Sequence, residues 1–158
     1  MATYEGSKSA AEARFAIVAS RFNQEVVDRL VQGAQDGFKS SRVAEEYIDL
    51  IWVPGSFEIP LVAQRLASSD AYAAVVCLGA VIRGATDHYD FIASEAARGV
   101  AQAGLTTGVP VIFGILTCAT EEQALDRAGG TEGNKGYDAA LAAIEMASLL
   151  QKLPGKTS

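Results

Sequence analysis

The chain has few residues of the kinds that build disulfide scaffolds or metal centres. Among its 158 residues there are two cysteines, one histidine and four prolines. Cys77 and Cys118 each lie in or just after an apolar run, with no cysteine or histidine partner at metal-binding spacing. We therefore expect two reduced core thiols in a cytoplasmic protein, with neither a disulfide framework nor a metal site.

Long hydrophobic runs and an excess of positive charge are also missing. No apolar run reaches the ~18 to 20 residues that span a bilayer, and the N-terminus lacks the apolar core of a signal peptide. Thirteen Lys and Arg residues against nineteen Asp and Glu residues give a net charge of −6. Neither a membrane nor a nucleic acid is therefore expected as a partner. An anionic ligand would need a local cluster of donors, because the overall field does not attract it.

What the chain does have is an apolar composition and alternating strand and helix patterns. Hydrophobic residues make up 49% and charged residues 20%, which suggests that some surface is buried against other subunits. Strands are expected at 15–19, 47–53, 73–82 and 109–116. Helices are expected after an Asn23 cap, at 56–68 with a Ser56 cap, at 87–104, from a Thr120 capping box to 128, and from 134 or 135 to 150.

This alternation predicts an α/β fold with a parallel sheet covered on both faces. We assign residues 14–158 to a single domain, because the sequence contains no linker or internal repeat. Residues 1–13 are polar and lack a helical pattern. They form either a frayed arm or an extra strand on a neighbouring subunit's sheet edge.

The most informative segment is residues 79–89, with the sequence GAVIRGATDHY. The apolar run that leads into it has the length of a buried strand, and it stops at a turn of small residues. Gly84, Ala85 and Thr86 leave backbone N–H groups uncovered where the next helix begins, which is typical of an anion site. His88 follows, and histidine is the residue type that exchanges protons near neutral pH. The alternative is a strand-to-helix corner with an incidental histidine.

Other strand ends carry side chains suited to a ligand, and ligands of such sheets collect at the carboxyl ends of the strands. The residues concerned are Phe22 after the first strand, Ser56, Phe57 and Glu58 after the second, and Phe113 within the fourth. The alternative places Phe22 and Phe57 in the core and makes Glu58 a charge at a helix N-terminus. Together they predict a site with aromatic stacking, polyol recognition, phosphate binding and proton transfer.

Residues 127–136, with the sequence RAGGTEGNKG, form the last polar cluster. Four glycines predict a pliable loop between two helices, and this loop carries Arg127 and Lys135. An arginine is suited to close over a phosphate group through paired hydrogen bonds. The alternative is an ordinary connector with two solvated cations.

Five motifs taken together resemble the 6,7-dimethyl-8-ribityllumazine synthase family. They are RFN at 21–23, WVPGSFEIP at 52–60, GAVIRGATDHYD at 79–90, GVPVIFG at 108–114 and GNKG at 133–136. The resemblance covers nearly the whole chain. It implies a flavodoxin-like three-layer sandwich with a four-stranded parallel sheet, assembled as homopentamers whose active sites are shared between adjacent subunits. It also implies a transferase of riboflavin biosynthesis that condenses 5-amino-6-(D-ribitylamino)uracil with 3,4-dihydroxy-2-butanone 4-phosphate, releasing phosphate and water without a cofactor.

The resemblance further assigns roles to single residues. Phe22 corresponds to the ring that stacks on the pyrimidine, and Phe113 to an aromatic that the neighbouring subunit supplies. The segment that holds the ribityl chain corresponds to Ser56, Phe57 and Glu58. The backbone groups that contact the uracil edge correspond to Ala80, Val81 and Ile82. The residues assigned to the phosphate group are Ala85, Thr86, Arg127 and Lys135. His88 corresponds to the proton-transfer residue.

The chain departs from the family pattern at two places. Ser56 replaces an alanine seen in many members, which is harmless if its backbone N–H makes the contact. Thr131 stands where a lysine is common, and Glu132 beside it adds negative charge, which weakens the expected phosphate field.

The resemblance also bears on assembly and on alternative functions. The loop at 129–136 has no insertion of the kind seen in members that stop at pentamers, so we expect closed icosahedral shells of twelve pentamers, or 60 subunits. A functional association with riboflavin synthase is also expected as a partner interaction of a protein of riboflavin biosynthesis. The alternatives are a relative that dismutates lumazines, such as an archaeal-type riboflavin synthase, and a shell-forming or flavin-binding protein with vestigial catalysis.

Overall fold

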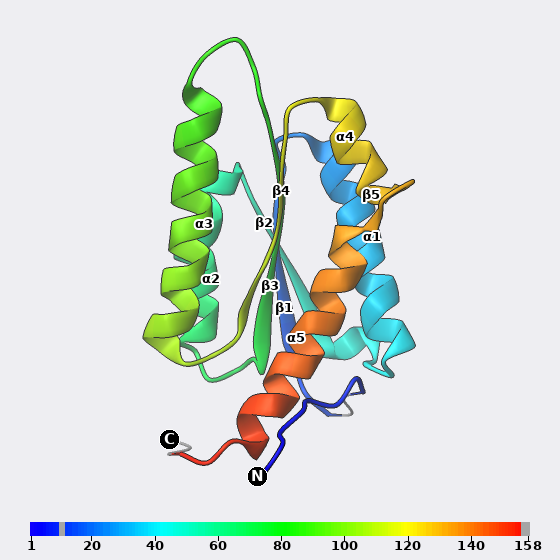
Figure 1. Cartoon of the computed structure of the whole chain (residues 1–158), viewed down its shortest axis with the longest axis vertical. Coiled ribbons are helices and arrows are strands. Elements are labelled where there is room, and N and C mark those ends of the chain that lie inside the picture. The colour runs from blue at the N-terminus through cyan, green and yellow to red at the C-terminus, as the bar shows by residue number, and fades with distance from the viewer. Residues whose placement is uncertain (10–11, 156–158) are drawn as a thin grey trace.

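The computed structural model describes residues 1–9 and 12–155, in which strands and helices alternate along the chain (Figure 1). The long elements are β1 (Phe15–Ser20), α1 (Gln24–Ser40), β2 (Ile48–Val53), α2 (Ile59–Ala67), β3 (Ala74–Ile82), α3 (His88–Thr107), β4 (Val111–Cys118) and α5 (Lys135–Lys152). The short ones are the 3-10 turns η1 (Glu45–Tyr47) and η2 (Ser56–Glu58), helix α4 (Glu121–Asp126), and strands β5 (Ala128–Gly130) and β6 (Gly133–Asn134). None of the described helices is both long and apolar enough to cross a membrane.

The main sheet has four parallel strands in the order β2-β1-β3-β4. Helices α2 and α3 cover one face, and α1, α4 and α5 cover the other (Figure 1). This arrangement confirms the predicted flavodoxin-like three-layer sandwich. The order of the strands reverses between β1 and β3, and this is the point of such sheets at which ligands bind.

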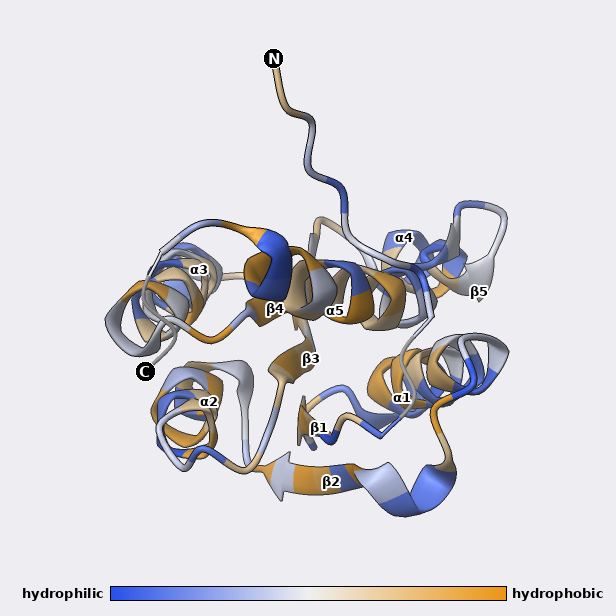
Figure 2. Cartoon of the chain, turned by 90° about the horizontal axis from the view of Figure 1, so that it is seen from below, coloured by the Kyte–Doolittle hydropathy of each residue, from blue (hydrophilic) through white to orange (hydrophobic). Residues whose placement is uncertain are grey.

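Two hydrophobic clusters fill the space between the sheet and its helices (Figure 2). The apolar residues of α1 recur at helical spacing and form its inward face, because all six are buried: Val26, Val27, Leu30, Val31, Ala34 and Phe38. Cys77 and Cys118 are buried and unbridged, as expected. Burial raises the pKa of the Cys77 thiol to about 12, so that thiol stays protonated and unreactive at neutral pH.

Two of the predicted helix caps are wrong. Asn23 has a left-handed backbone with φ of 64°, and its side-chain amide donates to the Ala80 carbonyl at 2.8 Å in place of capping α1. Ser56 begins the turn η2, so α2 starts three residues later, and the Ser56 side chain makes no capping bond. The cap at Thr120 is confirmed, since its hydroxyl oxygen accepts from the backbone N–H of Gln123. Asn134 caps α5 in the same way, because its side-chain oxygen accepts from the N–H groups of Gly136 and Tyr137.

The glycine-rich segment at 127–136 is a short antiparallel hairpin of β5 and β6, so the prediction of a pliable loop was wrong. Gly129 and Gly133 have φ of 99° and 80°, a backbone region that favours glycine and allows the tight turn. The backbone N–H of Lys135 donates to the Arg127 carbonyl at 2.8 Å. The glycines therefore serve a defined turn that fixes the spacing of the two cations.

The N-terminal segment lies against α5 of its own chain. The Ser7 N–H donates to Ser148 Oγ at 2.9 Å, and Lys152 Nζ donates to the Glu5 carbonyl at 2.9 Å. Residues 1–9 contain no strand, and residues 10 and 11 of the predicted arm lie outside the described residues. The predicted strand on a neighbouring sheet stays a prediction.

A polar cluster at the opposite edge of the sheet from the carboxyl ends predicts a pH-dependent stability. Tyr72 Oη donates to Asp49 Oδ2 at 2.6 Å, and Arg14 Nη2 lies 3.2 Å from the same oxygen. The hydrogen bond from Tyr72, and to a smaller extent Arg14, lower the pKa of Asp49 in the folded protein. The ionised carboxylate therefore stabilises the fold at pH values above the pKa of Asp49 in the unfolded chain. This contribution is lost as the pH falls through the lower pKa of Asp49 in the folded protein. The same hydrogen bond raises the pKa of Tyr72, because it requires the protonated phenol. Its contribution to the stability of the fold is therefore lost at alkaline pH, as Tyr72 loses its proton.

We expect Asp49→Asn to remove part of the acid sensitivity of the fold. Because the pair is half exposed, the effect should stay below about 1 kcal/mol. Urea unfolding at pH 7 and pH 3 should show a smaller loss of stability in Asp49→Asn than in the wild type, with the exposed Asp70→Asn as the matched control. If Asp49→Asn and Asp70→Asn lose the same amount of stability between pH 7 and pH 3, Asp49 is not a source of the acid sensitivity.

Candidate active site

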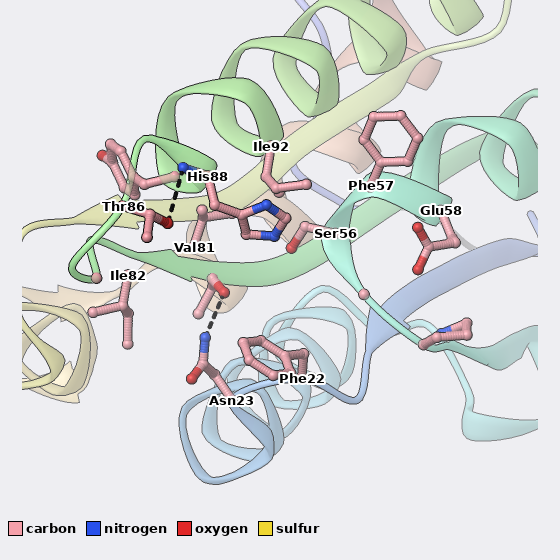
Figure 3. Close-up of a pocket in the computed structure, with 15 residues that line it drawn as sticks. Phe22, Asn23, Ser56, Phe57, Glu58, Val81, Ile82, Thr86, His88 and Ile92 are labelled. Atoms are coloured by element: carbon pink, nitrogen blue, oxygen red, sulfur yellow. Dashed lines mark hydrogen bonds between the residues drawn. The ribbon is translucent and has the colours of Figure 1, made fainter.

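A pocket of about 740 Å³ opens at the carboxyl ends of the strands, between β1 and β3 (Figure 3). Its walls come from the segments after β1 and β2, the end of β3 and the first turns of α3. The lining residues are Phe22, Asn23, Pro54, Gly55, Ser56, Phe57, Glu58, Ala80, Val81, Ile82, Gly84, Thr86, His88, Tyr89 and Ile92. Nine of the thirteen predicted site residues are therefore brought together in one pocket.

The two phenylalanine rings of this pocket are not core residues, so the core alternative was wrong. Phe22 is 71% exposed and Phe57 is 55% exposed. Backbone hydrogen bonds from Arg21 to the Val53 carbonyl and from Phe22 to the Pro54 carbonyl hold the first ring at the mouth. Large exposed rings at a fixed position offer apolar faces on which a planar heterocycle can stack.

The strand-to-helix turn at 83–87 is exposed, as an anion site requires. A Cβ on Gly84 would meet no atom within 4 Å, so packing does not demand a glycine there and the neighbouring amides stay open. His88 is the first residue of α3, and its N–H donates to Thr86 Oγ1 at 3.4 Å. Thr86 and His88 line the pocket, whereas Ala85 does not.

Arg83 holds this turn from outside the pocket. Its guanidinium carbon lies 4.5 Å from the centroid of the Tyr89 ring, and Nη2 lies 3.5 Å from Asp90 Oδ1. Its backbone N–H donates to the Cys118 carbonyl at 2.9 Å. These contacts tie the end of β3 to the first turn of α3, and so help to fix the position of His88.

Sequence reasoning missed three residues of this pocket. Asn23 was interpreted only as a cap, although it follows Phe22 directly, and its amide occupies one acceptor site of the Ala80 carbonyl. Tyr89 and Ile92 were not considered as site residues. Ile92 lies one helical turn after His88, and that spacing was the signal available for it.

A second pocket, of about 410 Å³, holds the remaining charged residues of the prediction. Its lining residues are Phe113, Ile115, Leu116, Thr117, Cys118, Arg127, Glu132, Lys135 and Asp138. They come from β4, the edge strand of the sheet, and from the hairpin and α5. Within one chain, Phe113, Arg127 and Lys135 thus lie in a different pocket from His88 and Thr86.

The second pocket combines cations with an exposed aromatic ring. Arg127 Nη1 donates to the Gln123 carbonyl at 3.0 Å, which orients the guanidinium. Desolvation raises the pKa of Cys118, and the nearby Arg127 charge partly offsets that rise. The backbone N–H of Glu132 donates to the Asp126 carbonyl at 2.8 Å, which holds Glu132 in the hairpin. Glu132 lines the second pocket, and its neighbour Thr131 does not.

The fold and the first pocket together define a doubly wound α/β protein with a small-molecule site at the topological switch point. The sequence matches the 6,7-dimethyl-8-ribityllumazine synthase family over residues 12–151 of 158, and the chain belongs to that family. Membership implies lumazine synthase activity in riboflavin biosynthesis.

Proposed function

We propose that the chain condenses 5-amino-6-(D-ribitylamino)uracil with 3,4-dihydroxy-2-butanone 4-phosphate, in active sites shared by two copies of the chain. The observation that carries this proposal is the division of the site. One pocket holds rings, backbone groups and a histidine, and the other holds an aromatic ring and two cations. A neighbouring copy whose second pocket faces the first would supply Phe113, Arg127 and Lys135 together.

The first pocket suits the pyrimidine and its ribityl chain. Phe22 would stack on the heterocycle, and backbone groups of Ala80, Val81 and Ile82 would bind its polar edge. Because one acceptor site of the Ala80 carbonyl is used by Asn23, the second lone pair or the neighbouring carbonyls would serve the ligand. Glu58 and the Ser56–Phe57 backbone would bind the ribityl hydroxyls.

The phosphate group would lie between the exposed turn and the neighbour's cations. Free amides at 84–86 and the Thr86 hydroxyl would donate to phosphate from one side, and Arg127 and Lys135 from the other. His88, next to this turn, would move protons at the reacting centre.

The chemistry accounts for the modest number of catalytic groups. The 5-amino group of the pyrimidine adds to the ketone and forms a Schiff base with loss of water; phosphate elimination, ring closure and dehydration follow. Both reactants are intrinsically reactive, so holding them together supplies much of the acceleration. Binding the phosphate before and during its departure stabilises the charge that develops.

Exposed apolar side chains on α2 and α3 support the proposed assembly. Leu61, Phe91 and Leu105 are large, hydrophobic and exposed in the single chain. Such residues on one side of a protein are typical of subunit contacts. We propose pentamers that assemble into shells, in a cytoplasmic setting that suits the two unbridged cysteines; association with riboflavin synthase stays a prediction.

Mixing both substrates with the protein tests the proposal. Lumazine absorbance and phosphate should rise together, and analytical ultracentrifugation should show pentamers or multiples of them. Conversion of lumazine alone into riboflavin would favour the dismutating relative. A species smaller than a pentamer with full activity would contradict the shared site.

Glu132 should weaken the binding of the phosphate substrate, because its carboxylate lines the same pocket as Arg127 and Lys135. Removing one exposed like charge near a phosphate group is worth up to about 1 kcal/mol, so Glu132→Gln should lower the KM for the butanone phosphate by roughly two- to fivefold. The KM for the pyrimidine should not change. Thr131→Val, outside the pocket lining, serves as the control.

A further inference from the structure

Behind Ser56, which lines the first pocket, lies a buried serine hydroxyl that the proposed function does not use. Ser20, the last residue of β1, is 0% exposed, and its Oγ has no hydrogen-bond partner among residues 1–9 and 12–155. The side chain lies on the sheet face that α2 and α3 cover, next to a buried cluster of apolar residues. A buried hydroxyl without a partner destabilises a fold, so its presence at the edge of a ligand pocket needs an explanation.

Ser56 presents a second hydroxyl to the same space. It is 5% exposed, and its side chain points into the pocket that His88 also lines (Figure 3). Both oxygens face the backbone of Gly79 in β3. A Cβ at that glycine would lie 2.6 Å from Ser56 Oγ and 2.9 Å from Ser20 Oγ. The absence of a side chain at residue 79 therefore leaves room for both hydroxyls next to the same point of β3.

We propose that Ser20 is a positioning residue that acts through Ser56, and that Ser56 Oγ binds a hydroxyl of the polyol chain on the substrate. This inference rests on the proposed function. Rotation of a serine side chain between staggered positions lets Ser20 donate to Ser56 Oγ. A hydroxyl both accepts and donates, so Ser56 can then donate its own proton to the ligand.

The arrangement explains why a side chain at residue 56 matters. A backbone N–H contact to the polyol is available to any residue type, whereas the Ser56 hydroxyl adds a directed donor. Ser20 fixes the direction of that donor, and consecutive hydrogen bonds of this kind strengthen one another. In the free protein Ser20 Oγ has no partner, and the bond to Ser56 would form only when a ligand accepts the Ser56 proton. The Ser20 hydroxyl would therefore lower the stability of the free protein and raise its affinity for the ligand.

Direct binding of two lumazines to the assembled protein tests the inference without relying on turnover. One ligand is 6,7-dimethyl-8-ribityllumazine, and the other carries a methyl group in place of the ribityl chain. Because one hydrogen bond to the ligand is lost, Ser20→Ala and Ser56→Ala should each lower the affinity for the ribityl ligand by about fivefold. The double variant should bind the ribityl ligand as tightly as Ser56→Ala does. Neither change should affect the methyl ligand.

A stability measurement adds a readout that a merely structural role would not give. Ser20→Ala removes an unpartnered buried hydroxyl, so the free protein should melt about 2 to 4 °C higher while its ribityl affinity falls. Ser41→Ala, at a buried serine outside both pockets, is the matched control. Ser20→Cys replaces the hydroxyl with a somewhat larger thiol that is a weaker donor, and should show the same loss of affinity if the alanine variant fails to fold.

The outcomes separate this inference from the proposed function. If the wild type binds the ribityl ligand and Ser20→Ala binds it equally well, the inference is wrong and the proposed function stands. Equal losses for both ligands, or additive losses in the double variant, would also overturn the relay through Ser56. If the wild type binds neither lumazine, both the proposed function and the inference fail.

Discussion

His88→Ala should lower the turnover of the proposed condensation by roughly 10- to 100-fold, at the low end of the range for general acid–base catalysis. The side chain is exposed at the start of α3, so the variant should fold and assemble normally. Single-turnover measurements with both substrates at saturation would isolate the chemical step.

His88→Gln is the matched control, because glutamine keeps a polar side chain of similar size but cannot exchange a proton near neutral pH. It should be as slow as the alanine variant. A glutamine variant with the wild-type rate would reduce His88 to a hydrogen-bonding role, and wild-type turnover in both variants would remove it from the mechanism.

Arg127→Ala should raise the KM for the butanone phosphate by roughly 10- to 100-fold, as expected for the loss of a charge-assisted hydrogen bond to phosphate. The KM for the pyrimidine should change little. Phe22→Ala should do the reverse, because it removes stacking area from the other substrate. Arg65→Ala, an exposed arginine on α2 outside both pockets, provides the control for loss of charge.

Mixed assemblies of two damaged variants would show whether the two pockets meet between subunits. His88→Ala chains retain Arg127, and Arg127→Ala chains retain His88. If each site takes one residue from each of two neighbours, random co-assembly of equal amounts should restore about a quarter of the sites. A mixture no more active than the average of its two components would place both residues in the same chain's site.

Much of the fold could be predicted because its signals are local. The run of β-branched residues before Gly84 and the spacing of apolar residues on α1 each specify one element. The ligand pocket followed from a rule about parallel sheets, since the ends of β1, β2 and β3 must meet at one edge. That rule placed Phe22, Glu58 and His88 together correctly.

The rest depended on geometry that residue order does not carry. Sequence motifs place His88 after a strand and Arg127 after a short helix, but they do not show that Arg127 lies in a separate pocket beside the edge strand β4. Asn23 has the composition of a helix cap, and only its left-handed backbone sends the amide to the Ala80 carbonyl. The glycines at 129–136 predict flexibility in isolation, and the backbone pairing of β5 with β6 turns them into a hairpin.

The contacts between the N-terminal segment and α5 bring Glu5 next to Lys152, on the side of the sheet away from the first pocket (Figure 1). A peptide that joins the segment around Glu5 to the end of α5 would close the backbone into a ring without crossing that pocket. Opening the ring in the exposed connection between α2 and β3, at residues 69–71, would place the new ends on the same side. The same architecture is therefore compatible with a circularly permuted sequence that begins with β3, in which the turn at 83–87 and His88 would be translated before Phe22.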